Sequence, residues 1–399
     1  MSARILAGFA ESLAAPECVW SLRDAGFDVV LFARRGARPA LRYSKRLAIV
    51  EVEPPELDAA RAARQVADHA RALGVAATMP FDDAAVWALD RAEPELPAVL
   101  GPTGEQARFA LDKEVQVAAA RNAGFGVPPT RVAGADELLA APDKVDFPSY
   151  VKPAAAVEAV DGRLARHFGG MCADAAELAA VAAPFGDARV LVQPVVRGTN
   201  HGLFGFFADG ELLATHAHER VRMVAPAGSG SSACRPAPVP SELLQPLRRL
   251  LSTAGWNGMF MVEFLRDRDG NWWFVELNGR AWGSMALARD IGAEYPAWVA
   301  TKALEDPQFR PPRVEYAGHG FVCRHLGRDI VHLLSVLRGH HSRAALDWPR
   351  RGKTLRDVLV IRRSDRWYNA RRGESKVFLY DAYRTVFDFL RSFVRRRFV

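Results

Sequence analysis

Residues 257–280, NGMFMVEFLRDRDGNWWFVELNGR, consist of two apolar runs joined by the turn sequence Asp-Arg-Asp-Gly. Such a turn between apolar runs predicts a β-hairpin. Glu276, Asn278 and Arg280 occupy every second position after the second run, so their side chains are expected on one face of its strand. With the turn at the centre of the hairpin, Glu263 is predicted to lie directly opposite Glu276.

Glu263 and Glu276 would therefore bring two carboxylates together. Opposed side chains in a sheet have Cβ atoms about 5 Å apart, and two unit charges at that distance repel by about 3 kcal/mol at an effective dielectric constant of about 20. A bound cation relieves this repulsion, and so would replacing Glu276 by Gln, which is expected to stabilise the metal-free protein. Two carboxylates with the amide oxygen of Asn278 suit Mg²⁺, with Mn²⁺ as the alternative. The competing interpretation is an ordinary hairpin whose acids face solvent.

The sequence before this hairpin predicts two kinds of structure. Short apolar strands alternate with helices over roughly the first hundred residues, which is typical of a parallel α/β sheet. The first turn, GFAESLAAPE at 8–17, lacks the GxGxxG pattern of dinucleotide-binding domains. Residues 103–124 are then predicted as one helix that begins with a capping box, Thr103 and Gln106. Strands are expected at 147–154, which carries Lys152, and at 188–200.

Five motifs in this order resemble those of the ATP-grasp superfamily, over roughly residues 1–310. They are the α/β start, Asp112-Lys113 followed by GFGVPPT, YVKP around Lys152, LVQPVVRGTN at 191–200, and Glu263 followed by Glu276-x-Asn278-x-Arg280. The Trp-Gly-Ser sequence after Arg280 also resembles the carboxylate–amine ligase-like branch. The resemblance implies an α/β (α+β) protein with a Rossmann-like pre-ATP-grasp domain at 1–102, ATP-grasp subdomains at 103–192 and 193–317, and a mostly helical basic region at 318–399.

The resemblance also implies roles for individual residues. Lys113 and Lys152 would contact the phosphates of ATP, and Arg280, with Lys152, would act on the transferring phosphoryl group. The metal ligands would be Glu263, Glu276 and Asn278, and the adenosine would be bound by Gln193, Val195, Val196 and Asn200. Gln193 and Pro194 replace the acid and lysine usual at the adenine, and Asn200 replaces the glutamate usual at the ribose, which removes charge from the nucleotide site.

A second group of polar residues is the candidate substrate site. Arg220 and Arg222 are two positions apart on a predicted strand, so both are expected on one face, where they could hold a carboxylate or phosphate. The Gly/Ser-rich loop that follows contains Ser229 and Ser231 and could present backbone N–H groups to an anion. The competing interpretation is a surface strand with a flexible loop.

The positive charge of the chain is concentrated at its end. Residues 343–399 contain 16 Lys and Arg against 6 Asp and Glu, whereas the whole chain has a formal net charge of +7. The helix predicted at 381–399 carries an apolar stripe: Tyr383, Val386, Phe387, Leu390, Phe393 and Val394. We expect peripheral contact with anionic membrane through this helix, against the alternative that the stripe packs on the body of the protein. Nucleic acid is not expected as a partner.

The function predicted on these grounds is an ATP- and Mg²⁺-dependent ligase. It would activate a small-molecule carboxylate as an acyl phosphate and join it to an amine, releasing ADP and phosphate. The alternatives are a biotin-carboxylase-like carboxylation and a non-catalytic, nucleotide-binding, membrane-associated module. The four scattered cysteines and the absence of an apolar stretch of roughly 18 residues predict a cytoplasmic protein. Its basic C-terminal helix would place it peripherally at the inner face of the membrane. A homodimer is also expected.

Overall fold

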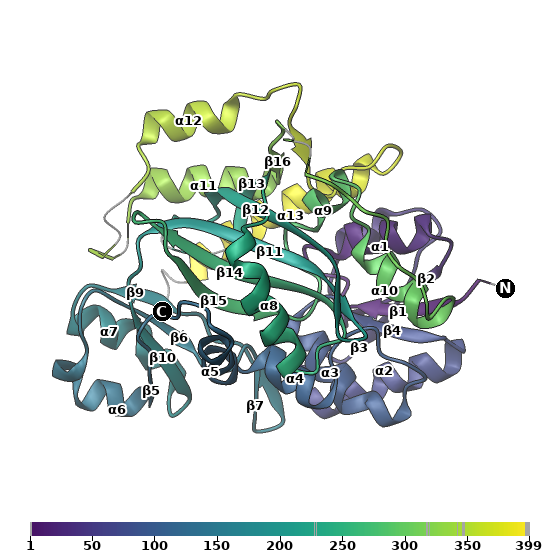
Figure 1. Cartoon of the computed structure of the whole chain (residues 1–399), viewed down its shortest axis with the longest axis horizontal. Helices are drawn as coiled ribbons and strands as arrows, with labels where there is room; N and C mark the ends of the chain where they lie inside the picture. Colours follow the sequence, from purple (N-terminus) through teal and green to yellow (C-terminus); the bar gives the residue numbers. More distant parts are fainter. Residues whose placement is uncertain are drawn as a thin grey trace.

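The computed structural model describes residues 2–226, 228, 230–316, 318, 320–340, 342–344 and 348–395, with side chains through Ser392. Three main sheets and their helices form the molecule, with the largest sheet at its centre (Figure 1).

The N-terminal sheet is parallel, with strand order β3-β2-β1-β4. Its strands are β1 (Arg4–Gly8), β2 (Asp28–Arg34), β3 (Ala48–Val52) and β4 (Ala77–Pro80), and its helices are α1 (Ala15–Asp24), α2 (Ala59–Leu73) and α3 (Asp83–Ala92). Two of these helices begin at an aspartate whose side chain accepts a backbone N–H of the first turn: Asp58 for α2 and Asp82 for α3. The predicted parallel α/β start is confirmed.

The helix predicted over 103–124 is in fact two helices, α4 (Gly104–Leu111) and α5 (Lys113–Ala123). The backbone of Asp112 is extended, and its side chain caps α5 by accepting the N–H groups of Glu114 and Val115. The predicted capping box is also wrong, because Thr103 makes no side-chain cap hydrogen bond and the Gln106 amide donates to the carbonyl of Gly255. The break places Lys113 at the start of a helix instead of in the middle of one.

The second sheet is antiparallel, with strand order β5-β10-β6-β9. Its strands are β5 (Arg131–Gly134), β6 (Ser149–Pro153), β9 (Gly170–Cys172) and β10 (Arg189–Pro194). It packs with α6 (Ala135–Ala140) and α7 (Ala175–Ala182), and a small hairpin of β7 (Glu158–Val160) and β8 (Arg163–Ala165) extends from it (Figure 1). Val151 and Val190 are fully buried in its core.

The central sheet has seven strands in the order β15-β14-β11-β12-β13-β16-β17. They are β11 (Gly198–Ala208), β12 (Glu211–Met223), β13 (Ser231–Ala237), β14 (Gly258–Asp267), β15 (Trp272–Asn278), β16 (Cys323–Arg324) and β17 (Arg366–Trp367). The helices that accompany it are α8 (Ser241–Thr253), α9 (Met285–Asp290) and α10 (Tyr295–Leu304). The last two strands come from the basic C-terminal region, so that region extends the central sheet.

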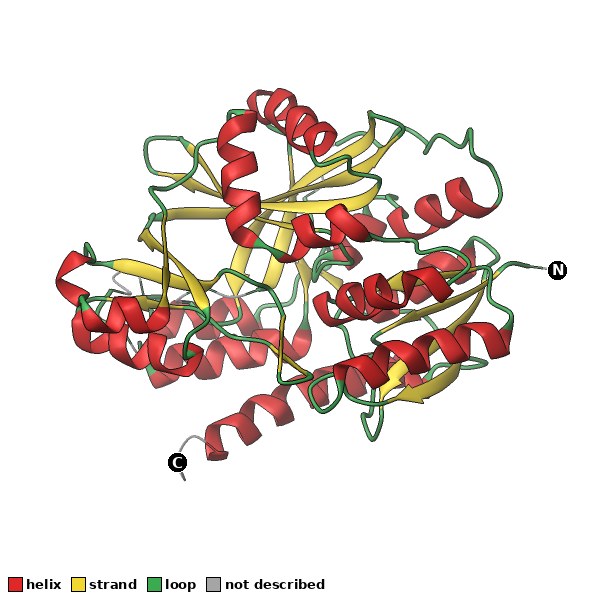
Figure 2. Ribbon diagram, turned by 90° about the horizontal axis from the view of Figure 1, so that it is seen from below, coloured by secondary structure: helices red, strands yellow, loops and turns green. Residues whose placement is uncertain are grey.

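Three helices complete the C-terminal region: α11 (Leu326–Arg338), α12 (Arg351–Leu359) and α13 (Ser375–Arg395). In Figure 2, α13 is the helix at the lower edge of the view that ends next to the C-terminus. It packs closely on α11 at Gly327, where an added Cβ would lie 2.6 Å from the carbonyl oxygen of Ala382. A buried network joins α11 to the sheet: Asp329 accepts hydrogen bonds from Arg222 and from Arg324.

The stripe predicted on the last helix is divided between the body and the surface. Val386 is half-buried, whereas Tyr383, Phe387 and Leu390 are exposed. The other two members, Phe393 and Val394, lie outside the described side chains. Among the residues that the structure describes, none of the helices combines the length and the apolar character that a membrane span requires.

Candidate active site

The predicted carboxylate pair is present: β14 and β15 are antiparallel, and Glu263 lies directly opposite Glu276. Each acid has its own cation. Glu263 is 2.5 Å from an Nη atom of Arg220, and Glu276 is 3.2 Å from Nζ of Lys113. Each negative charge is therefore compensated by a cation, and these two ion pairs give a reason to expect that replacing Glu276 destabilises the metal-free protein.

Lys152 is the second lysine whose charge acts on Glu276. It is almost fully buried on β6 and donates from Nζ to the backbone carbonyl of Val275 at 3.0 Å. Burial lowers the pKa of Lys152 to about 8, although Glu276 acts in the opposite direction. Burial would raise the pKa of Glu276, but the positive charges of Lys113 and Lys152 outweigh it and hold that pKa at about 2. Glu276 therefore remains a carboxylate, the form that binds a metal.

Gln116 fixes the position of Lys113, and sequence reasoning missed it. Its buried amide donates to the carbonyl of Leu277 at 2.9 Å and accepts the N–H of the same residue at 2.8 Å, so α5 is hydrogen-bonded to β15. The same helix is held against β6 through the N–H of Lys113, which donates to the carbonyl of Ala154. The only sequence signal for Gln116 was its place one helical turn after Lys113.

Asn278 and Arg280 follow Glu276 as predicted, but Arg280 already has a partner. Asn278 is buried, with its amide nitrogen 3.5 Å from a Glu276 oxygen. Arg280 donates to both carboxylate oxygens of Asp83, at 3.0 and 3.2 Å, and to the carbonyl of Ala281. Asp83 directly follows the capping residue Asp82 in the first turn of α3, a helix of the N-terminal sheet. Sequence reasoning had no signal for this contact.

The residues predicted for adenosine lie where the second sheet meets the central one. The buried side chain of Gln193 donates to the hydroxyl of Thr130 at 2.8 Å. The N–H of Val195 donates to the carbonyl of Pro148, and Val196 follows in the connection to β11. Asn200 is half-buried on β11, opposite Leu265.

The prediction that Arg220 and Arg222 share one face is wrong. A β-bulge shifts the register between them, so Arg220 lies opposite Cys234 and Arg222 opposite Ala233. Because neighbouring residues of a strand point to opposite faces, the two guanidiniums separate. Arg222 pairs with Asp329. Ser231 is buried on β13, and Ser229 lies outside the described residues.

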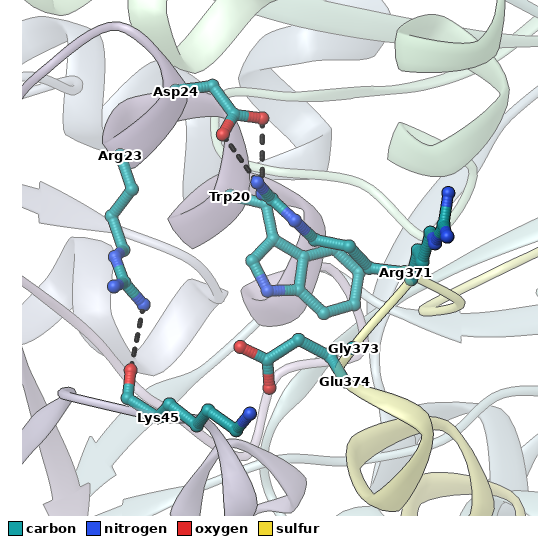
Figure 3. A pocket seen from close by; sticks show the side chains of 8 residues that line it. Trp20, Arg23, Asp24, Lys45, Arg371, Gly373 and Glu374 are labelled. Carbon is teal, nitrogen blue, oxygen red and sulfur yellow. Dashed lines mark hydrogen bonds and ion pairs between the residues drawn. The ribbon is translucent and has the colours of Figure 1, made fainter.

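The metal prediction depends on two carboxylates and one amide. Among the described residues, no three His, Cys, Asp or Glu side chains form a cluster that could hold a metal by themselves. The pair Glu263 and Glu276 still fits Mg²⁺, which commonly takes one or two carboxylates together with phosphate oxygens and water. A separate hollow of about 350 Å³ lies between α1 and residues 371–374. Figure 3 shows the side chains that line it, among them Arg371, which pairs with Asp24. None of the predicted site residues lines it.

Comparison with known sequences gives one distant relative. No family model matches this chain. Pyruvate carboxylase 1 of Caenorhabditis elegans is 25% identical over 157 residues, which cover 36% of this chain and only 13% of that protein.

Solved structures resemble the chain more extensively. The L-amino acid ligase of Bacillus licheniformis has a TM-score of 0.56 at 17% identity, covering 76% of this chain and 74% of that chain. The N5-carboxyaminoimidazole synthetase of Staphylococcus aureus has a TM-score of 0.58 at 11% identity, covering 78% of each chain. The biotin carboxylase domain of Hydrogenobacter thermophilus 2-oxoglutarate carboxylase, a dimer with MgADP and bicarbonate, has a TM-score of 0.57 at 15% identity, covering 78% and 71%. At these identities the likeness establishes the fold.

Proposed function

This chain has the ATP-grasp fold, as its sequence predicted, and we propose that it is an ATP-dependent ligase that joins a carboxylate to an amine. The supporting observation is the group formed by Glu263, Glu276, Lys113 and Lys152. It combines two carboxylates of the kind that hold Mg²⁺ with two cations of the kind that bind phosphate, between the second and central sheets.

Each residue of the site would have its own role in such a reaction. Mg²⁺ bound by Glu263, Glu276 and Asn278 would neutralise charge on the phosphates of ATP. Lys113 and Lys152 would bind phosphate oxygens as point charges. The backbone at Gln193, Val195 and Val196, with the side chain of Asn200, would receive the nucleoside. Arg280, oriented by Asp83, would stabilise charge on the transferring phosphoryl group.

The proposed chemistry has two displacements. An oxygen of the substrate carboxylate bonds to the γ-phosphorus while the bond from that phosphorus to the ADP oxygen breaks. The amine nitrogen then bonds to the acyl carbon, the bond to the phosphate oxygen breaks, and the amine proton passes to water. The products are an amide, ADP and phosphate.

Hydroxylamine tests this proposal because it intercepts acyl phosphates. Purified protein with ATP, Mg²⁺, hydroxylamine and a panel of carboxylic acids should form a hydroxamate together with ADP. Formation of AMP and pyrophosphate would show that the acid is adenylated instead, and the proposal would be wrong.

Carboxylation is the second candidate, favoured by the pyruvate carboxylase match and the biotin carboxylase likeness. It predicts ADP release that depends on bicarbonate and biotin and needs no amine. A non-catalytic module would instead bind nucleotide without any turnover. A homodimer remains part of the proposal and is tested by light scattering.

A further inference from the structure

The hollow between α1 and residues 371–374 is lined by two residues that each carry a buried, unpaired polar atom. Nε1 of Trp20 is a hydrogen-bond donor and Oε2 of Glu374 is an acceptor, and neither has a partner among the described residues. Trp20 is only 1% exposed. The other carboxylate oxygen of Glu374 accepts a hydrogen bond from the hydroxyl of Ser44 at 2.9 Å, which fixes the direction of the carboxylate.

The two unpaired atoms face the same space. Figure 3 shows the indole nitrogen of Trp20 on the side of the ring toward the carboxylate of Glu374. Buried polar groups in proteins are paired in the great majority of cases, so a donor and an acceptor left unpaired beside one hollow indicate that a ligand supplies their partner. A hydroxyl group suits both, because its oxygen accepts from Nε1 while its hydrogen is donated to Oε2.

The rim of the hollow is positively charged. Four basic side chains line it against two acids. One of the acids, Asp24, is already paired with both Arg371 and Arg289. Two of the basic side chains, Lys45 and Arg372, are exposed and have no acidic partner within the described part of the chain. Their charges are therefore available to an anionic group, with which they would form charge-assisted hydrogen bonds.

We propose that this hollow is a second ligand site, which binds a small hydroxylated anion of the sugar-phosphate or hydroxy-acid class. A hydroxyl of the ligand bridges Trp20 and Glu374, and its phosphate or carboxylate lies at Lys45 and Arg372. The volume of about 350 Å³ falls within the range of about 300–1,000 Å³ that is usual for small-molecule sites. None of the residues assigned to ATP, metal or substrate lines the hollow, so the inference does not depend on the proposed ligase function.

A ligand at this place connects the two ends of the chain. Trp20 belongs to α1, and Glu374 directly precedes α13. These segments already meet at Arg371, whose guanidinium pairs with Asp24 and lies over the ring of Trp20, 5.8 Å from its centroid. Because the ligand binds only the folded arrangement of α1 and residues 371–374, it should also raise the Tm of the protein.

The test is calorimetry on the full chain with four probes: glycerol 3-phosphate, glycerate, glycerol and methyl phosphate. Glycerol 3-phosphate or glycerate should bind. Glycerol lacks the anionic group and methyl phosphate lacks the carbon-bound hydroxyl, so each should bind at least about 10-fold more weakly. Tighter binding of glycerol 3-phosphate identifies the anionic group of the ligand as a phosphate, and tighter binding of glycerate identifies it as a carboxylate.

Three variants locate the binding in this hollow. Lys45→Gln combined with Arg372→Gln should weaken binding by about 10-fold or more, and both positions are exposed, so the fold is kept. Trp20→Phe retains an aromatic ring but removes the N–H, and should weaken binding by about 5-fold. The control, Lys376→Gln, removes an exposed charge close in sequence that does not line the hollow, and should bind like wild type.

Three results would overturn the inference. If neither glycerol 3-phosphate nor glycerate binds, water is the partner of the two unpaired atoms. If glycerol or methyl phosphate binds as tightly as the hydroxylated anions, the hollow does not recognise both groups together. If the double variant or Trp20→Phe binds like wild type, the probe lies elsewhere, as it would at the lysines proposed for the phosphates of ATP.

Discussion

Glu276 is the residue on which both the proposed metal site and the local charge balance depend. We predict that Glu276→Gln reduces Mg²⁺-dependent ATP turnover by at least about 100-fold, the loss typical of one charge-stabilising group. It should also lower the stability of the metal-free protein by about 1–3 kcal/mol, because Lys113 and Lys152 lose the carboxylate between them. Turnover assays and denaturant melts without Mg²⁺ measure the two effects. Normal turnover would contradict the metal site.

The pKa of Lys152, about 8, predicts how nucleotide binding depends on pH. Only the protonated amine attracts phosphate, so the Kd for ADP should be nearly constant below pH 8 and rise by up to about tenfold per pH unit above it. Lys152→Arg should remove this dependence, since the guanidinium stays protonated. Calorimetric titrations at pH 7–10 give the result. The same Kd at both ends of that range would show that Lys152 does not contact the phosphates.

At the scale of elements, Asp329 connects α11 to the central sheet, because its carboxylate accepts hydrogen bonds from Arg222 and Arg324. Asp329→Asn should destabilise the protein by about 3–5 kcal/mol, because it leaves two buried guanidiniums without their carboxylate. Asp357→Asn is the matched control, since its ion pair with Lys353 lies at the surface of α12 and should contribute no more than about 1 kcal/mol. Denaturant melts of the two variants should differ clearly, and equal losses would disprove the role given to Asp329.

The predicted contact with anionic membrane would involve the exposed side of α13. Leu379, Tyr383 and Leu390 are each at least half exposed. Replacing all three by Ser should release the protein from anionic vesicles at low salt, because the apolar contact is lost while the arginines remain. The paired change Leu359→Ser and Ile361→Ser removes comparably exposed apolar surface near α12 and serves as the control. Co-sedimentation measures binding. If the wild-type protein does not co-sediment with anionic vesicles, the prediction is wrong.

At the scale of the whole molecule, the site depends on contacts between parts that are distant in sequence. Asp83 of α3 accepts hydrogen bonds from Arg280, which follows β15 and is 197 positions away. The C-terminal region reaches the N-terminal domain as well, where the N–H of Asn369 donates to Glu17, 352 positions away. The arrangement of the domains therefore decides which arginines are available to substrates.

The sequence by itself determined the hairpin and the opposition of Glu263 and Glu276, because a short turn and strict alternation are local rules. It also determined the fold class, through motifs that occur in a recognisable order. Tertiary structure alone decided the partners of the charges. Three features could not be read from the local sequence: the bulge that separates Arg220 from Arg222, the ion pair of Arg280 with Asp83, and the ion pair of Arg222 with Asp329. Electrostatic partners are chosen by proximity in space, and proximity between distant segments exists only once the sheets and helices have packed.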